Sequence, residues 1–381
     1  MTMRRVILGL AIAVCVPATV CASGDTAPRW IVPIDSRTTD QWLSEGAGVV
    51  YGARDGRLVA LDMRDGHVVW ASHVATVTKS AVSGDAVAAP TASGVVFLRA
   101  RDGAVVHRSA LGSAPIVASA AAGFVSVVRT RTGVEARGWT FDGRPRWARS
   151  YRGAPFGTLL QLGGNAVGLV DAGSGNLLVI DGGNGNGVAA TDGVDTLIGA
   201  DGRYLWFNVL GGGVKGLDLD TNRTVALHGS VVRGAARVEH SVAVAVVDGR
   251  LVRLDLRTGT QVPLKVDGRW IGGPADGRIF IERSDGVYVR DLSPRGEQRR
   301  VARYAGQARL VAADRNIGMI AMHDGRIFVV DLPKARPLAT IQTTCTAYEG
   351  FATSDSTTLV HCDKDRDSEL VAFDRYASLR Q

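Results

Sequence analysis

Long apolar runs, cysteines and lysines are all scarce in this sequence. Beyond the N-terminus no stretch approaches the roughly 18 apolar residues that a membrane-spanning helix requires, so we predict no transmembrane segment. The four cysteines and seven histidines show no metal-ligand spacing, which predicts no metal site. Lysine accounts for 5 residues against 39 arginines, a bias that we attribute to codon usage. No basic cluster interleaved with aromatic residues indicates nucleic acid as a partner.

The N-terminus has the three parts of a secretory signal. Arg4-Arg5 is the basic part, Val6–Val16 is the apolar part, and Val20-Cys21-Ala22 offers small residues at a cleavage site. We therefore predict cleavage after Ala22 and a periplasmic or secreted protein. The apolar part is too short to span a bilayer.

Two of the four cysteines, Cys15 and Cys21, lie in this predicted signal. Both follow valine, whereas lipid attachment prefers a small residue before the cysteine, so a lipoprotein acylated at Cys21 is the less favoured alternative. Cleavage leaves Cys345 and Cys362, 17 residues apart on predicted strands of adjoining segments. In an oxidising compartment we predict that they form a disulfide, with two free buried thiols as the alternative.

The clearest pattern in the chain is VVYGARDGRLVALDMRDGHVVW, from Val49 to Trp70. Three short apolar runs rich in β-branched residues are separated by Asp55-Gly56 and Asp65-Gly66. β-branched runs favour strands, and Asp-Gly supplies the positive φ angles of tight hairpin turns. The pattern therefore predicts three consecutive strands, the last of which ends in an aromatic residue.

This unit recurs along the chain. Taking Asp62 as the anchor, the residue after the last apolar position of the second strand, the spacing between equivalent positions is 36 to 43 residues. The nine positions are Asp62, Arg99, Trp139, Asp181, Asp218, Asp255, Asp291, Asp331 and Asp374. A period near 40 with several short strands per unit predicts an all-β protein with a single β-propeller of four-stranded blades.

The number of blades is less firmly indicated. Nine hairpins are counted, and the third unit, which ends in Trp147, is the least regular. Because eight-bladed rings are much commoner among propellers of this kind and one irregular unit could be an embellishment, we predict eight blades with nine as the alternative. Trp30–Ile34 has no hairpin partner nearby and is predicted to close the ring as the outer strand of the last blade. We thus divide the chain into a signal peptide (residues 1–22), a short disordered lead-in (23–28) and the propeller (29–381).

Units written as LVALDMRDGHVVW, and more weakly as LVRLDLRTGTQV, resemble the PQQ-repeat propellers of the quinoprotein-like superfamily. That superfamily includes PQQ-dependent dehydrogenases and the BamB family of outer-membrane assembly factors. The resemblance implies the fold more strongly than an activity. This chain departs from the BamB pattern in lacking a good acylation site. It departs also at Tyr151–Leu160, where the segment before the fourth blade keeps one arginine but not the partner-binding pattern.

Residues for catalysis are not apparent in the repeats. A quinone-dependent enzyme, as the resemblance implies it, would need a calcium site, a catalytic Asp and adjacent cysteines, whereas the Asp residues here fall in repeat turns. Asp363 to Asp374 has some acidic spacing of a calcium loop, but Ser368 stands where that loop has glycine. We predict no catalytic residues, no cofactor and no enzymatic activity.

One recurring motif could bind a partner or a ligand. Asp-Gly-Arg occurs seven times, and Arg57, Arg250 and Arg326 occupy the same turn of different units. We expect these three to lie on one face of the ring, where guanidinium groups could hold carboxylates of a partner protein or an anionic glycan. The alternative is that Asp-Gly forms the turn and Arg merely faces water.

The function predicted from these patterns is that of an exported, non-catalytic interaction scaffold in the cell envelope, with a role in assembling outer-membrane proteins or secretion machinery. The expected partner is an envelope protein, and peripheral association with the outer membrane is left open. A propeller that binds a glycan or small ligand, and a degenerate PQQ-type enzyme, are the alternatives.

Overall fold

The computed structural model describes residues 28–34, 44–46, 48–54, 56–154, 156–171, 175–201, 203–221, 223–227, 231–293, 296–303, 306–313, 316–334, 336–343, 345, 347–353, 357–364 and 367–374. The predicted signal peptide and almost all of the predicted lead-in lie outside these residues. Among the described residues no helix is long and apolar enough to cross a membrane.

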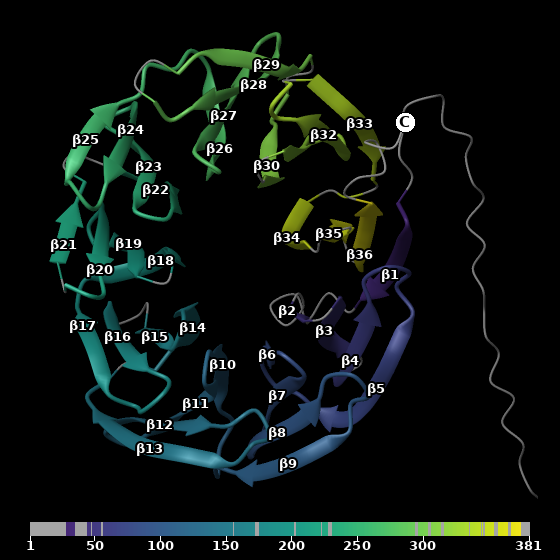
Figure 1. The fold of residues 1–381 in the computed structure, drawn as a ribbon, viewed down its shortest axis with the longest axis vertical. Coiled ribbons are helices and arrows are strands. Elements are labelled where there is room, and N and C mark those ends of the chain that lie inside the picture. Colours follow the sequence, from purple (N-terminus) through teal and green to yellow (C-terminus); the bar gives the residue numbers. More distant parts are fainter. Residues whose placement is uncertain are drawn as a thin grey trace, which may run out of the picture.

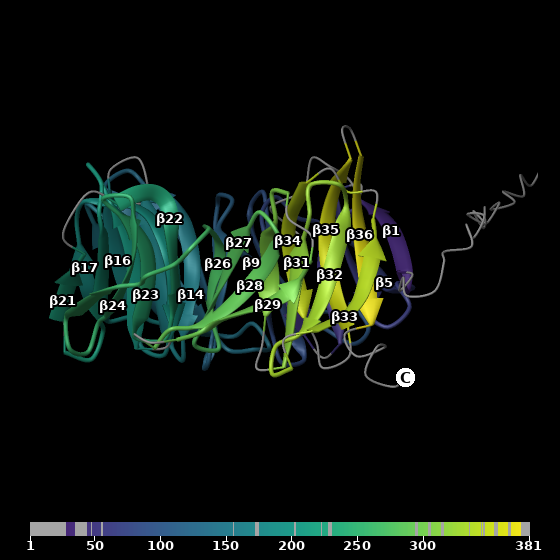
Figure 2. The ribbon, with the colours of Figure 1, turned by 90° about the horizontal axis from the view of Figure 1, so that it is seen from above.

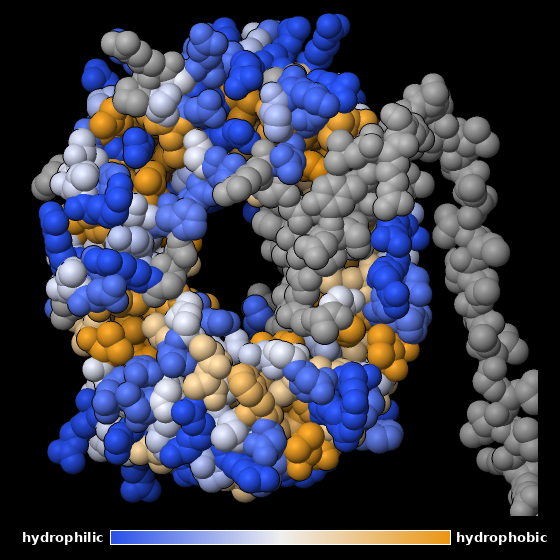
Figure 3. Space-filling view, in the orientation of Figure 1, coloured by the Kyte–Doolittle hydropathy of each residue, from blue (hydrophilic) through white to orange (hydrophobic). Residues whose placement is uncertain are grey.

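The described residues form nine four-stranded antiparallel sheets, arranged as blades around a central opening (Figures 1 and 3). We number the blades from 1 to 9 along the chain. Blades 1 to 3 consist of β2 (Ser44–Gly46), β3 (Val49–Arg54), β4 (Arg57–Asp62) and β5 (Val68–Ala75); β6 (Ala81–Ser83), β7 (Ala86–Thr91), β8 (Gly94–Arg99) and β9 (Val105–Ala110); and β10 (Ile116–Ala120), β11 (Gly123–Thr130), β12 (Gly133–Trp139) and β13 (Pro145–Arg152).

Blades 4 to 6 are built in the same way. They consist of β14 (Thr158–Gly163), β15 (Ala166–Asp171), β16 (Asn176–Asp181) and β17 (Gly187–Thr191); β18 (Val194–Asp201), β19 (Tyr204–Val209), β20 (Val214–Asp218) and β21 (Arg223–Ala226); and β22 (Val231–Glu239), β23 (Val242–Val247), β24 (Arg250–Asp255) and β25 (Thr260–Pro263).

Blades 7 to 9 complete the ring. They consist of β26 (Arg269–Ala275), β27 (Arg278–Arg283), β28 (Gly286–Asp291) and β29 (Gln298–Ala302); β30 (Arg309–Ala313), β31 (Ile317–Ala321), β32 (Arg326–Asp331) and β33 (Arg336–Gln342); and β34 (Ala347–Thr353), β35 (Thr357–Lys364), β36 (Asp367–Asp374) and β1 (Trp30–Ile34).

The prediction that an N-terminal strand closes the ring is confirmed. β1 pairs antiparallel with β36, from Trp30 opposite Ala372 to Ile34 opposite Ser368, so the last blade takes its outer strand from the other end of the chain. Closure in this way covers a sheet edge that would otherwise stay open.

The expected eight blades are wrong, and the alternative count of nine is right. The irregular third unit is a complete blade because its substitutions preserve both the core and the turn. At the anchor, Trp139 is buried, with 2% of its surface exposed, and its indole N–H donates to Ser126 Oγ at 2.9 Å. In the following turn the Thr140 hydroxyl accepts the Arg144 backbone N–H at 2.9 Å, where other blades use a carboxylate.

The anchor residues found in the sequence end the third strand of all nine blades. Where the anchor is aspartate, its carboxylate commonly receives a backbone N–H of the next turn. Arg64 N donates to Asp62 Oδ1 at 2.7 Å, and Gly183 N donates to Asp181 Oδ1 at 2.7 Å. The repeated Asp therefore satisfies turn N–H groups, which is a structural role.

Tryptophans of the outer strands lock blades together. Trp70 of β5 donates its indole N–H to Ala100 O in blade 2 at 2.6 Å, and its ring lies against Gly103. Trp30 of β1 contacts Met63 O and Gly66 in blade 1 in the same manner. The positive φ angles of these turn glycines, +68° at Gly103 and +73° at Gly66, and the close approach of the rings explain why glycine is required there.

The chain direction separates the turns into two faces, between which the strands run (Figure 2). Because neighbouring strands are antiparallel, the turns between second and third strands share one face with the connections between blades. We call this face 1. The turns between first and second strands and between third and fourth strands lie on the opposite face, which we call face 2.

Candidate functional site

Face 1 carries the three arginines that the sequence singled out. Arg57, Arg250 and Arg326 are the first residues of β4, β24 and β32, the third strands of blades 1, 6 and 8. The register of the repeat therefore places them on one face. Blades 6, 8 and 1 alternate with blades 7 and 9, so the arginines form an arc with one at every second blade.

These three side chains differ in their surroundings. Arg57 and Arg250 are exposed, whereas Arg326 is partly buried and donates from Nε to Asp324 Oδ2 at 2.8 Å. The Arg326 guanidinium also lies 5.7 Å from the centre of the Phe328 ring. A partner carboxylate that binds Arg326 must share it with the aspartate of its own turn.

The other four Asp-Gly-Arg arginines have structural ion pairs, and most lie elsewhere. Arg144, Arg203 and Arg278 are at turns on face 2, while Arg269 begins β26 on face 1 and pairs with Glu282. Arg203 binds Asp218, the anchor of its own blade, through two hydrogen bonds of 2.8 and 2.6 Å. This pairing lowers the pKa of Asp218 to about 2, mainly because the guanidinium hydrogen bonds favour the charged carboxylate.

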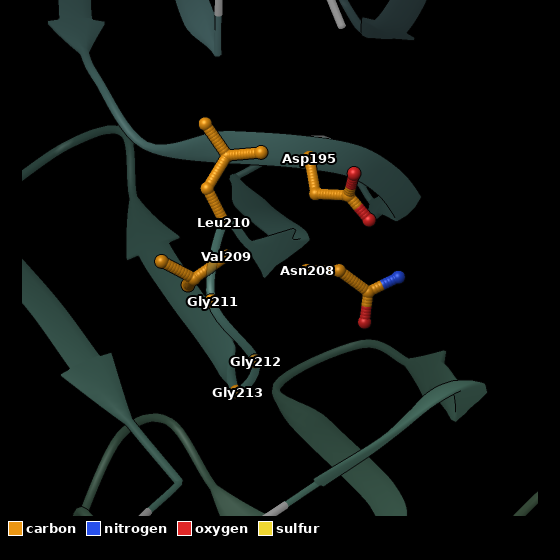
Figure 4. Close-up of a pocket in the computed structure, with 7 residues that line it drawn as sticks. All are labelled: Asp195, Asn208, Val209, Leu210, Gly211, Gly212 and Gly213. Carbon is orange, nitrogen blue, oxygen red and sulfur yellow. The ribbon is translucent and has the colours of Figure 1, made fainter.

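A small pocket opens on face 1 in blade 5, next to blade 6 with Arg250. It has a volume of about 200 Å³ and is lined by Asp195 of β18, by Asn208 and Val209 at the end of β19, and by the turn from Leu210 to Gly213. The polar ends of Asp195 and Asn208 point to the same side, whereas Val209 and Leu210 lie on the other side of the turn (Figure 4). Pockets for drug-sized ligands usually measure about 300–1,000 Å³, so this one is smaller than a typical site for such a ligand.

This pocket was not predicted from the sequence. Its only sequence signal is the glycine run from Gly211 to Gly213, in which all three φ angles are positive and a Cβ atom would meet nothing within 4 Å. The approach of Asp195 depends on strand register and could not be foreseen.

Among the described residues, one group of potential metal ligands was found, on face 2 in blade 1. Asp62, Asp65 and His67 offer ligand atoms within 4.8 Å of one another. Their atoms already serve the turn, because Arg64 donates to both oxygens of Asp62 and His67 Nδ1 lies 2.5 Å from Asp65 Oδ1. This arrangement is the turn signature of the repeat, and we assign no metal to it.

The predicted disulfide between Cys345 and Cys362 is confirmed, with Cα atoms 5.2 Å apart. Cys362 lies in β35, but Cys345 lies just before β34 rather than on a strand. Both residues are buried in the apolar cluster between blades 8 and 9, which includes Ile327 and Phe373. The bond therefore secures the last blade, where the ring closes.

Two other predicted segments can be placed in part. Tyr151–Leu160 spans the end of β13 and the start of β14, so it connects blades 3 and 4 on face 1, and only Pro155 within it lies outside the described residues. In the acidic segment after Asp363, residues 365 and 366 lie outside the described part of the chain, and the residues on either side belong to β35 and β36.

Comparison with known proteins agrees with the repeats. Residues 11–133 match the family model described as outer membrane protein assembly factor BamB. No curated protein matches the chain.

Among solved structures, BamB from Moraxella catarrhalis is 14% identical, with a TM-score of 0.48, over 90% of this chain and 98% of that one. The computationally designed Ika8 protein is 14% identical, with a TM-score of 0.52, over 92% and 100% of the two chains. The C-terminal WD40 domain of Sif2 is 15% identical, with a TM-score of 0.46, over 78% and 96%. At such identities the designed protein shows a likeness of fold alone. The predicted resemblance is thus confirmed: this chain folds as a β-propeller, and its residues 11–133 match the BamB family model.

Proposed function

We propose that this protein is an exported, non-catalytic scaffold that captures a protein partner of the cell envelope on face 1, in the assembly of outer-membrane proteins or of secretion machinery. The observation that carries the proposal is the arc of Arg57, Arg250 and Arg326 on one face of a closed ring. The match of residues 11–133 to the BamB family supports the envelope context, and the disulfide is in keeping with an oxidising compartment.

The rigidity of the ring suits such a role. Loops held by a stiff scaffold lose little conformational entropy on binding, so more of the contact energy appears as affinity. The arc, the blade 5 pocket and the connection between blades 3 and 4 all lie on face 1. Arginine can bind carboxylates through two parallel hydrogen bonds, and we expect an acidic surface on the partner.

The absence of catalysis in this proposal is supported by what the aspartates do. Asp62, Asp181 and Asp218, three of the anchor aspartates of the repeat, each accept turn N–H groups in their own blades. Their position in the repeat accounts for them without any reaction.

The test is capture of the partner in cells. Arg57→Glu, Arg250→Glu and Arg326→Glu are combined, and envelope proteins crosslinked to the protein are identified by mass spectrometry. The matched control reverses three exposed charges on face 2 with Arg223→Glu, Arg257→Glu and Lys334→Glu. We expect the face 1 variant to lose its crosslinked partner while the control keeps it, with both proteins folded by circular dichroism. Equal capture by the two variants would refute the proposal.

A further inference from the structure

The net charge of the chain is concentrated in blades 2 and 3. Residues 99–152 contain ten arginines, two aspartates, one glutamate and no lysine, a formal charge of +7, which equals the formal net charge of all 381 residues. The remainder of the chain is therefore neutral on balance. Such a local excess of one sign marks a surface for an anionic partner.

The formal charge of +7 already subtracts the three acidic residues of this segment. Each of them lies beside an arginine of its own turn or strand, so the remaining arginines are not neutralised by them. Asp102 contacts Arg99 at 3.5 Å and Arg101 at 3.8 Å, Asp142 pairs with Arg144, and Glu135 pairs with Arg137. The other arginines are exposed: Arg108, Arg129, Arg131, Arg146, Arg149 and Arg152. Among the described residues, none of these six forms an ion pair with an acidic side chain.

Four of these arginines belong to the outer strands. Arg108 lies on β9, and Arg146, Arg149 and Arg152 lie on β13, the outer strands of blades 2 and 3. Figure 1 shows the two strands following one another along the outer circumference of the ring. We call this surface the blade 2–3 rim.

The same rim exposes large apolar side chains. Val105 and Val106 begin β9 and are 43% and 48% exposed, and Phe141 in the β12–β13 turn is 41% exposed. All three lie toward face 2, so an apolar margin runs beside the arginines. Val68 and Val69 of β5 continue this margin into blade 1.

We propose that the blade 2–3 rim docks the protein on an anionic phospholipid surface, with arginines at the headgroups and the valines and Phe141 at the boundary with the acyl chains. Several unpaired arginines beside exposed apolar residues have the composition that binds such surfaces. The rim lies on the outer circumference of the ring and is separate from the pocket at Asp195 and Asn208, which lies in blade 5.

Addition of a partner's strand to the edge is less well supported. β13 begins with Pro145, which has no N–H, and three of its eight residues are arginines. Proline and charge protect edge strands from pairing. The proposal does not depend on the face 1 arc of Arg57, Arg250 and Arg326, because it uses other arginines and a different ligand.

The test measures sedimentation with vesicles. Binding of the protein to phosphatidylcholine vesicles containing phosphatidylglycerol is compared with binding to phosphatidylcholine alone, using Cys21→Ala proteins so that no acyl chain attaches there. The rim variant combines Arg108→Gln, Arg149→Gln and Arg152→Gln. The control variant removes three exposed charges from blades 5 and 7 with Arg223→Gln, Arg299→Gln and Arg303→Gln. All proteins share one N-terminus, so any effect of that segment cancels.

The parent protein is expected to sediment with the anionic vesicles only, and less as salt is raised. Each arginine near an anionic surface strengthens binding about fivefold, so the rim variant should bind about a hundredfold more weakly, and the control within about twofold of the parent. Val106→Ser with Phe141→Ser should lower the binding that survives high salt. Equal binding by the rim and control variants would overturn the proposal. A parent protein that does not bind the anionic vesicles would also overturn it. If that protein instead captured an acidic protein through these arginines, the rim would be a protein interface.

Discussion

Trp70 gives the sharpest test of how the blades are held together. Its side chain is 8% exposed, its ring centre lies 5.8 Å from that of Tyr51, and its indole N–H bonds to Ala100 O in the next blade. Trp70→Ala removes this contact and leaves a cavity between blades 1 and 2. Trp70→Phe keeps much of the apolar contact but loses the hydrogen bond.

The magnitudes follow from burial. A buried tryptophan removes about 150–250 Å² from water, and substitutions of large core aromatics by alanine cost about 3–5 kcal/mol. We expect Trp70→Ala to lower the free energy of unfolding by about 4 kcal/mol and Trp70→Phe by about 1–2 kcal/mol, the latter mainly from the lost hydrogen bond. Val69→Ala, one residue earlier on β5 and 36% exposed, should cost less than about 1 kcal/mol and serves as the control.

A substitution at Gly103 separates the contact with the Trp70 ring from other effects on the free energy of unfolding. A Cβ atom at Gly103 would lie 2.6 Å from the Trp70 ring, and Gly103 has a φ of +68°, so Gly103→Ala suffers both a clash and an unfavourable backbone. With Trp70→Ala the clash disappears and only the backbone cost of about 1 kcal/mol remains. Urea unfolding followed by far-ultraviolet circular dichroism measures all four proteins of this cycle. The reasoning fails if Trp70→Ala costs less than about 1 kcal/mol, or if Gly103→Ala costs the same with and without the tryptophan.

Two further predictions concern a salt bridge and the disulfide. Because Arg203 lowers the pKa of Asp218 to about 2, below the unfolded value of about 3.9, their pairing stabilises the fold fully above about pH 4 and is lost as pH falls toward 2. Arg203→Gln should therefore lower the urea midpoint at pH 6 but much less at pH 2.5, and an equal loss at both values would contradict the assignment. Replacing Cys345 and Cys362 by alanine opens a link between residues 17 apart and should cost about 3 kcal/mol, seen as a lower thermal midpoint that reductant no longer changes. A midpoint equal to that of the oxidised parent would show that the bond does not stabilise the last blade.

The strands and their order could be predicted because the information is local. The Asp anchor, the glycine four residues later and the apolar runs lie within about 20 residues, and all nine anchors end a third strand. Trp30–Ile34 could be placed as the closing strand because the C-terminal unit has only three strands of its own. The blade count went wrong because one irregular unit was taken for an embellishment, although all nine anchors had been found. In blade 3 a buried Trp139 and a Thr140 hydroxyl replace the aspartate that most other blades have at the anchor, and the blade is complete.

The candidate site was harder to predict because it depends on pairs distant in sequence. Seven Asp-Gly-Arg motifs look alike, yet Arg203 binds Asp218 and Arg269 binds Glu282, so two of them are consumed by partners 15 and 13 residues away. The motif alone does not distinguish these two arginines from the exposed Arg57 and Arg250 at the turns between second and third strands. The blade 5 pocket likewise needs Asp195 and Asn208 to meet across two strands.

The position of a charged side chain within its blade determines whether it is paired locally or available to a ligand. Many charges in the turns of face 2 are paired locally, as Arg144 with Asp142 or Arg64 with Asp62. Outer-strand arginines such as Arg149 and Arg152 have no neighbouring turn aspartate, because the repeat places its acids at strand ends. A ring that rests on its blade 2–3 rim has its axis parallel to the lipid surface, and both faces then remain open to solution. Docking on lipid and capture of a partner on face 1 are therefore compatible, since neither surface blocks the other.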